Sequence, residues 1–137
     1  EAREGSAWTE EEDAWSAETR RLWGEAEAPR VYGTAVIVPI FFGHALSLNI
    51  QLNARPHAEQ LSATLKSAPG IKVLDSLAER IYPMPMLVTA DPSVHVGRIR
   101  AVPNDPESFL LFATIDNAGR GAALNAVEVG QMLLHRQ

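Results

Sequence analysis

The chain has 137 residues, of which 46% are hydrophobic and 21% are charged, and its 12 basic and 17 acidic residues leave a net charge of −5. This is the balance of one globular domain whose core needs no disulfide or metal. Cysteine is absent, which excludes thiol catalysis, zinc–thiolate sites and disulfides within the chain. No basic stripe favours nucleic acid, and no run reaches the ~20 apolar residues of a membrane span. Because the chain begins at Glu1 in a polar stretch, we expect it to be a fragment of a longer protein.

Residues Thr9 to Trp23 are predicted to form a helix. The letters "TEEE" form a capping box, in which the Thr9 hydroxyl accepts from the amide of Glu12 and the Glu12 carboxylate accepts from the amide of Thr9. Acidic residues fill the first turn, two arginines lie in the last turn, and Gly24 follows. This order suits the helix dipole and a glycine stop.

After a linker over residues 25–30, two strands are expected. Val31 to Pro39 is mostly apolar and β-branched, which is typical of a strand. Ala45 to Leu52 alternates between leucine or isoleucine and polar or small residues, which predicts a half-buried strand. If this second strand begins one residue earlier, His44 has the parity of the apolar face and points inward.

The rest of the chain favours an α+β fold with a mixed, largely antiparallel sheet packed by helices on one face. Residues 76–93, which contain "YPMPM" and "DP", are expected to be mostly irregular. The other expected elements are a helix over 57–67, strands over 71–75, 94–102 and 108–116, and a last helix over 121–135.

Two of these elements need cover on more than one side. The strand over 108–116 carries Phe109 and Leu111 on one face and Leu110 and Phe112 on the other, so a bare face would invite association with a second copy. The helix over 121–135 is apolar almost all round, which predicts burial between two layers or against a missing domain. Polar residues of the Ala45–Leu52 strand would supply a polar part or the rim of any contact.

Four blocks of residues resemble the C-terminal, substrate-binding and dimerisation domain of aspartate-semialdehyde dehydrogenases, and in particular their non-catalytic paralogues. The blocks are "TEEEDAWSAETRRLWG", "TAVIVPIFFGHALSLNI", "YPMP" followed by "VHVGRIR", and "IDNAGRGAALNAVEVGQMLL". They span nearly the whole chain in the family's order. The resemblance implies a fold like the C-terminal domain of glyceraldehyde-3-phosphate dehydrogenase, a homodimer, and a cytoplasmic protein of amino-acid biosynthesis.

The resemblance also implies a reaction and a set of roles. The family's enzymes reduce aspartyl phosphate to the semialdehyde with NADPH, using a cysteine on a nucleotide-binding domain that this chain lacks. By resemblance, His44 is the catalytic acid and base and Glu11 binds the substrate amine. Asn117 and Gly121, at the start of the last helix, are expected to bind the cofactor NADP once that domain is joined. Free amides at a helix start suit such a group.

Two positions depart from the family's pattern. Ile37 stands where an arginine binds the substrate carboxylate, and Ala14 stands where a lysine helps to bind phosphate. Hydrogen bonds to charged groups contribute about 1.5 to 3 kcal/mol each, so an anion loses several kcal/mol here. The departure predicts a domain that keeps the fold and has lost the reaction.

Alternatives remain open for function and for single residues. The full protein can be an active NADP-dependent dehydrogenase whose carboxylate clamp has moved, for example to Arg30 or Arg98, or the chain can be a partner-binding adaptor. Arg98 and Arg100 share a face of their strand and either pair with acids across a subunit interface or are solvated. No metal site is expected, because no metal-ligand spacing connects the other histidines, His57, His95 and His135.

Overall fold

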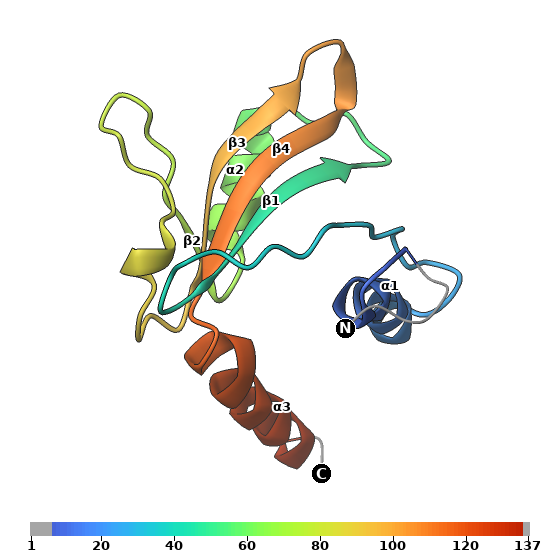
Figure 1. Cartoon of the computed structure of the whole chain (residues 1–137). Coiled ribbons are helices and arrows are strands. Elements are labelled where there is room, and N and C mark those ends of the chain that lie inside the picture. Colours follow the sequence, from blue (N-terminus) through green and yellow to red (C-terminus); the bar gives the residue numbers. More distant parts are fainter. Residues whose placement is uncertain (1–6, 136–137) are drawn as a thin grey trace. The chain divides into compact units, whose positions relative to one another are not determined.

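The computed structural model describes residues 7–135, which divide into two compact units, one ending at Pro39 and one beginning at Ile40 (Figure 1). The first unit contains helix α1 (Glu10–Trp23). The predicted capping box is confirmed: Thr9 N donates to Glu12 Oε2 at 3.0 Å and Glu12 N donates to Thr9 Oγ1 at 3.3 Å. The helix ends at Gly24, which has a φ of 88°.

The strand predicted over Val31 to Pro39 is wrong, because this segment has no regular secondary structure. Instead it follows α1 as an extended chain. The ring of Trp8 lies 6.4 Å from that of Tyr32, and Gly33 lies so close to Trp15 that an added Cβ would come within 2.5 Å of the indole. Apolar β-branched residues predict extended backbone, but a strand also needs a hydrogen-bonding neighbour, which a sequence pattern does not supply.

The second unit is built on a four-stranded sheet in the order β1-β4-β3-β2. The pairs β1–β4 and β4–β3 are antiparallel and β3–β2 is parallel, which confirms the predicted mixed, largely antiparallel α+β fold. The strands are β1 (His44–Gln51), β2 (Ile71–Val73), β3 (Val94–Val102) and β4 (Asp105–Ile115). β3 has the predicted bounds. β4 begins three residues early, because Pro103 and Asn104 make a tight turn with Val102 opposite Asp105.

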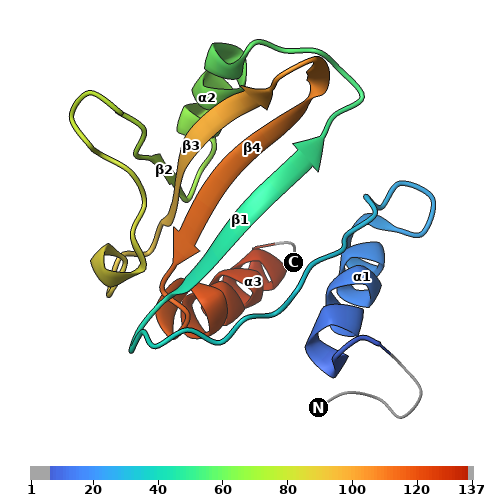
Figure 2. The same ribbon diagram turned by 45° about the horizontal axis from the view of Figure 1, so that its top comes forward.

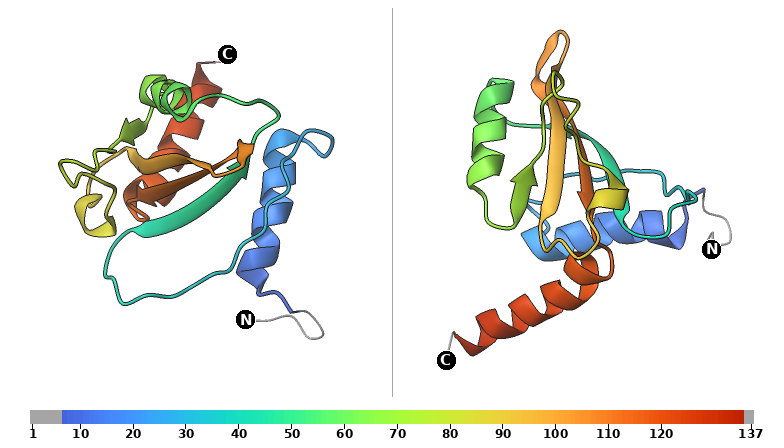
Figure 3. Two further views of the ribbon diagram at one scale, coloured as in Figure 1. Left: turned by 90° about the horizontal axis from the view of Figure 1, so that it is seen from above. Right: turned by 90° about the vertical axis from the view of Figure 1, so that its left-hand side faces the viewer.

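Helix α2 (Ala58–Ser67) covers one face of this sheet, as the edge-on view in Figure 3 shows. The segment between β2 and β3 is mostly irregular, as predicted, and contains one 3₁₀ turn, η1 (Pro85–Leu87). Pro83 lies against the face opposite α2, at Gly97 of β3. An added Cβ on Gly97 would come within 2.0 Å of the Leu74 carbonyl oxygen, so only glycine fits there.

The buried core lies between the sheet and α2. Val96, Leu111 and Ala113 form its centre, and half-buried apolar side chains of β1, β2 and α2 pack around them. Phe109 is completely buried, whereas Leu110 and Phe112 on the other face of β4 are only half-buried. Burial on the face opposite α2 is therefore uneven. Thr114, near the end of β4, is completely buried, whereas Leu110 and Phe112 are left half-buried.

The last helix differs from its prediction in two ways. A π-helical turn, η2 (Gly119–Ala123), precedes helix α3 (Leu124–Leu134), so the α-helix begins three residues later than expected. No residue of α3 is buried within the described chain, which contradicts burial between two layers of this chain. Large apolar side chains are exposed instead, at Val127, Val129, Met132, Leu133 and Leu134. None of the helices in the described residues is long and apolar enough to cross a membrane.

Candidate functional site

The candidate site is the corner where β4 ends and β1 begins. Because these strands are antiparallel, His44 lies opposite Ile115, and the next residues after β4, Asp116 and Asn117, come to the same edge of the sheet. Figure 2 shows β4 ending beside the start of β1 before the chain turns into α3. The topology therefore brings together His44 and Asn117, two site residues predicted from distant parts of the sequence.

Gly43 connects the two sides of this corner. It is buried, and its φ of 87° is in the left-handed region that favours glycine. An added Cβ would lie 3.1 Å from the Pro85 carbonyl oxygen and 3.1 Å from Val88. The amide of Gly43 donates to Asn117 Oδ1 at 3.1 Å. Asn117 therefore holds the backbone immediately before His44, a positioning contact that sequence reasoning missed.

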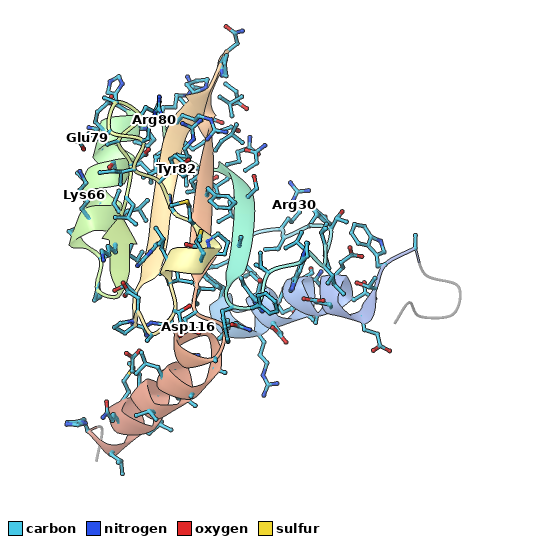
Figure 4. The ribbon with its side chains drawn as sticks, turned by 60° about the vertical axis from the view of Figure 1, so that its left-hand side comes forward. Arg30, Lys66, Glu79, Arg80, Tyr82 and Asp116 are labelled. Atoms are coloured by element: carbon cyan, nitrogen blue, oxygen red, sulfur yellow. The ribbon has the colours of Figure 1, made fainter. Side chains whose placement is uncertain are left out.

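Asp116 organises the turn that carries Asn117 (Figure 4). Its Oδ1 accepts from the amides of Ala118 at 3.0 Å and Gly119 at 3.3 Å, and its Oδ2 accepts from the amide of Ala90 at 3.0 Å. These bonds, led by the Ala90 amide, lower the pKa of the Asp116 carboxyl. Through these hydrogen bonds, Asp116 ties the end of β4 to the loop before β3.

Amides at the start of η2 already have acceptors within the chain. The sequence analysis expected free amides here that could bind an anion, and the structure corrects that expectation. Ala118 and Gly119 donate to the Asp116 side chain, and Gly121 N donates to the Asp116 carbonyl oxygen at 2.9 Å. The Asn117 side-chain oxygen is likewise engaged with Gly43. Cofactor binding by Asn117 and Gly121 stays a prediction. In this structure a cofactor could still accept a hydrogen bond from Asn117 Nδ2 or pack against the surface of the turn.

His44 is the first residue of β1 and has the parity of Leu46 and Leu48, but it is exposed and does not point into the core. Its ring makes no hydrogen bond or ion pair with any residue that the structure describes. An exposed imidazole on a fixed strand end can give or take a proton. The corner therefore presents a group that can act as an acid or a base, but no charged side chain among the described residues is paired with His44.

The other predicted site residues belong to the first unit. Glu11 is exposed on the first turn of α1, and Ala14 is half-buried one turn later. Ile37 is fully exposed to solvent. At these positions the chain offers a single carboxylate and two apolar side chains, and it presents no cation to a carboxylate or phosphate.

Glu12, and not Glu11, is the glutamate of α1 with a defined structural task. Besides the cap, its Oε1 accepts from the amide of Ala35 at 2.8 Å, so it fixes the extended segment that leads to Ile37. The amides of Thr9 and Ala35 lower the pKa of Glu12. The capping box was visible in the sequence, but the bond to a residue 23 positions away was not.

Arg98, one of the two arginines considered as substitute clamps, is not brought to the corner. Arg98 lies on β3 at an irregularity between Gly97 and Arg100, level with Leu111 of β4. Four residues of β4 separate that level from Ile115, the partner of His44, which is about 13 Å along a strand. Arg30 is exposed and belongs to the first unit (Figure 4).

One buried polar pair was missed by sequence reasoning. His95, which is 2% exposed, lies with its Nε2 2.7 Å from Asp91 Oδ2, and Lys72 Nζ lies 3.4 Å from the same oxygen. The amide of Ser93 and the His95 ring hold the pKa of Asp91 well below its usual range. The pair ties the loop before β3 to the sheet. Among the described residues, no group of three histidine or acidic side chains is arranged to hold a metal ion.

Comparisons with known proteins agree with this architecture. Residues 2–119 match the family model of the semialdehyde dehydrogenase dimerisation domain. The chain is 33% identical over 127 residues to an aspartate-semialdehyde dehydrogenase of Aquifex aeolicus, and 35% identical over 130 residues to one of a Synechocystis strain. These matches cover 93% and 94% of this chain but only 37% and 38% of the relatives.

A solved structure has the same fold. The crystal structure of aspartate semialdehyde dehydrogenase II complexed with ASA from Vibrio cholerae superposes with a TM-score of 0.87 at 28% identity. The superposition covers 96% of this chain and 38% of that chain. The chain therefore spans a little over a third of the relatives that it matches.

Proposed function

This chain belongs to the semialdehyde dehydrogenase family, whose dimerisation domain it matches, and from that premise we propose that it joins two copies of a longer protein into a symmetric homodimer. The observation that carries the proposal is the sheet face opposite α2, which the segment with Pro83 and the short turn η1 covers only in part (Figure 3). Closed two-fold pairs, in which the same patch meets itself, are the commonest soluble assemblies.

The composition of this face suits such a contact. Leu110 and Phe112 of β4 are half-buried, and they lie opposite Asn49 and Ser47 of β1, which are exposed. An apolar centre bordered by polar side chains is the usual arrangement of a subunit interface. The polar strand β1 then supplies hydrogen-bonding groups at the border of the contact.

Sedimentation of the full-length protein tests the dimer. Asn49→Lys places a charge on the proposed interface, where desolvation is costly, and should raise the dimer dissociation constant at least about tenfold, equivalent to ~1.4 kcal/mol. The matched control is Ala63→Lys on the exposed side of α2, which should leave the constant unchanged. Equal effects of the two variants, or none from Asn49→Lys, would refute this surface.

We propose further that the domain has lost the family's usual catalysis. Ile37 and Ala14, which by resemblance occupy the carboxylate and phosphate positions, are apolar, so two anionic groups of the substrate find no cation there. Leaving such groups without a partner in a closed site costs more than the lost bonds alone. His44 and Glu11 are then inherited site residues.

We expect a cofactor to bind only when this domain is joined to the rest of the longer protein. By resemblance, NADP would be held mainly by a nucleotide-binding domain outside this chain, with Asn117 and Gly121 at the border of its site. This assignment, like a cytoplasmic location, is a proposal for the whole protein.

The second candidate is an active NADP-dependent aspartate-semialdehyde dehydrogenase, and the ordered corner around Gly43 and His44 favours it. The double substitution Ile37→Arg with Ala14→Lys separates the two candidates. If only the anchors are missing, the double variant of the full-length protein should gain affinity for the substrate while the starting protein shows none. A starting protein that already binds substrate, with no gain in the double variant, would favour the second candidate.

A further inference from the structure

A cavity lies on the second unit between strands β3 and β4 and the segment that follows β2. Its volume is about 530 Å³, within the range of sites that hold small molecules. Its floor includes Pro83, which is completely buried. The lining residues are Leu77, Arg80, Tyr82, Pro83, Met84, Pro85, Arg98 and Phe112.

Both arginines of this cavity have a backbone that arginine rarely adopts. Arg80 has a φ of 57° and Arg98 a φ of 59°, in the left-handed region that costs a non-glycine residue conformational energy. Such a conformation persists only where the surroundings impose it. In Figure 4, Arg80 and Tyr82 lie on the segment after β2, in front of the strands.

The backbone around Arg98 is held by two hydrogen bonds. The register of β3 shifts between Gly97 and Arg100, Ile99 N donates to Asp75 Oδ2 at 2.8 Å, and Arg100 Nη1 donates to the Arg98 carbonyl oxygen at 2.6 Å. Irregularities of this kind re-aim a side chain within a strand. Here Ile99 packs against the core while Arg98 lines the cavity with Phe112.

Neither guanidinium in the cavity is engaged in an ion pair within the described residues. Within residues 7–135, Arg80 and Arg98 form no ion pair and their side chains donate no hydrogen bond, and the cavity lining contains no aspartate or glutamate. Other arginines are paired: Arg55 lies 2.9 Å from Glu107, and Arg120 lies 2.5 Å from Glu128. Two cations without an ion-pair partner among the described residues therefore border one apolar hollow, in a chain whose net charge is negative.

The larger groove of this unit lacks that property. It runs between α3 and the start of β2, with a volume of about 670 Å³, and its only arginine is Arg120. That guanidinium is already engaged by Glu128 and by the Pro92 carbonyl oxygen. Of these two hollows in the described residues, the Arg80–Arg98 cavity is thus the one with unpaired positive charge to select an anion.

We propose that the Arg80–Arg98 cavity binds a small organic anion that carries a carboxylate or phosphate group on a flat apolar body. The two guanidinium groups supply forked donors that match either anion. Tyr82 and Phe112 supply ring surface for the apolar body. This site is distinct from the His44 corner, but it shares Phe112 with the proposed dimer face, so it rests on a dimer that leaves the cavity open.

Calorimetric titrations of the full-length protein with benzoate, with phenyl phosphate and with inorganic phosphate test the site. We expect benzoate or phenyl phosphate to bind, and the one that binds more tightly identifies the anion. Arg98→Asn and Arg80→Asn should each weaken binding about tenfold or more, since each removes a charged donor. Asparagine tolerates the left-handed backbone, so these variants should keep the fold. The control Arg55→Asn, outside the cavity, should bind as the starting protein does.

Three results would overturn the proposal. The first is that neither organic probe binds, or that inorganic phosphate binds as tightly as phenyl phosphate, because the ring surface then contributes nothing. The second is unchanged affinity in the variant that carries both cavity substitutions. The third is a shift of the dimer dissociation constant by the same two substitutions in the absence of any probe, because the arginines would then pair with a carboxylate of a second copy.

Discussion

The His44 corner and the segment around Ile37 differ in how many hydrogen bonds hold them in place. At the corner, the turn is held by the Gly43 bond to Asn117 and by three amides on Asp116. Around Ile37, the Glu12 bond to Ala35 is present, but the residue two positions later is a fully exposed isoleucine. Under the proposed function, the corner would then hold His44 in a fixed position, while the segment at Ile37 would offer no anchor to an anionic substrate.

The largest expected effect on stability comes from a substitution at Gly43, in the more extensively hydrogen-bonded region. Gly43→Ala places a side chain on a backbone with a φ of 87°, which costs about 1 to 3 kcal/mol, and the close contacts with Pro85 and Val88 add to that. We expect the largest loss of unfolding free energy in denaturant titration. The control Gly130→Ala, at a helical glycine with open space around it, should be neutral or stabilising. Similar losses at the two glycines would contradict the account of the corner.

The next largest expected effect on stability tests whether Asn117 holds the corner. Asn117→Ala leaves the buried Gly43 amide without its acceptor, so we expect a loss of about 1 to 3 kcal/mol in unfolding free energy. Asn117→Asp keeps an acceptor oxygen and should restore most of that loss. NMR of the His44 ring should show a changed environment in Asn117→Ala and a near-normal one in Asn117→Asp. A cofactor role alone predicts no change in either measurement.

A smaller effect concerns pH. The folded pKa of Asp116 is lowered by amide hydrogen bonds, so its contribution to stability is present above the ordinary carboxyl pKa and is lost as pH falls through the folded value. Asp91, whose pKa is also lowered, acts in the same direction. Stability should therefore decline on the acid side, and Asp116→Asn should flatten part of that decline. An unchanged acid slope in Asp116→Asn would show that its carboxylate is not held in this way.

Much of the fold was readable from local patterns, because capping, alternation and turn residues act over a few positions. The capping box at Thr9 and the strand over 94–102 are examples. The Val31–Pro39 strand failed because pairing depends on a neighbour far along the chain. The His95–Asp91 pair and the Asn117–Gly43 bond were missed for the same reason: nothing in the spacing of these residues announces a contact made by the folded sheet.

The candidate site was predicted in part. His44 and Asn117 were named from resemblance, and the topology places them at one edge of the sheet. The roles given to Glu11, Asn117 and Gly121 stay predictions. The expected free amides at the last helix failed, because Asp116 follows β4 directly and takes them. A sequence shows that an aspartate is present, but not that three amides converge on it.

Turnover by the full-length protein tests the central claim most directly. The protein would be assayed with aspartate semialdehyde, phosphate and NADP, in parallel with its His44→Ala variant. The account predicts no turnover that depends on His44, because the anionic groups of the substrate meet Ile37 and Ala14. Ordinary turnover that His44→Ala abolishes would contradict it.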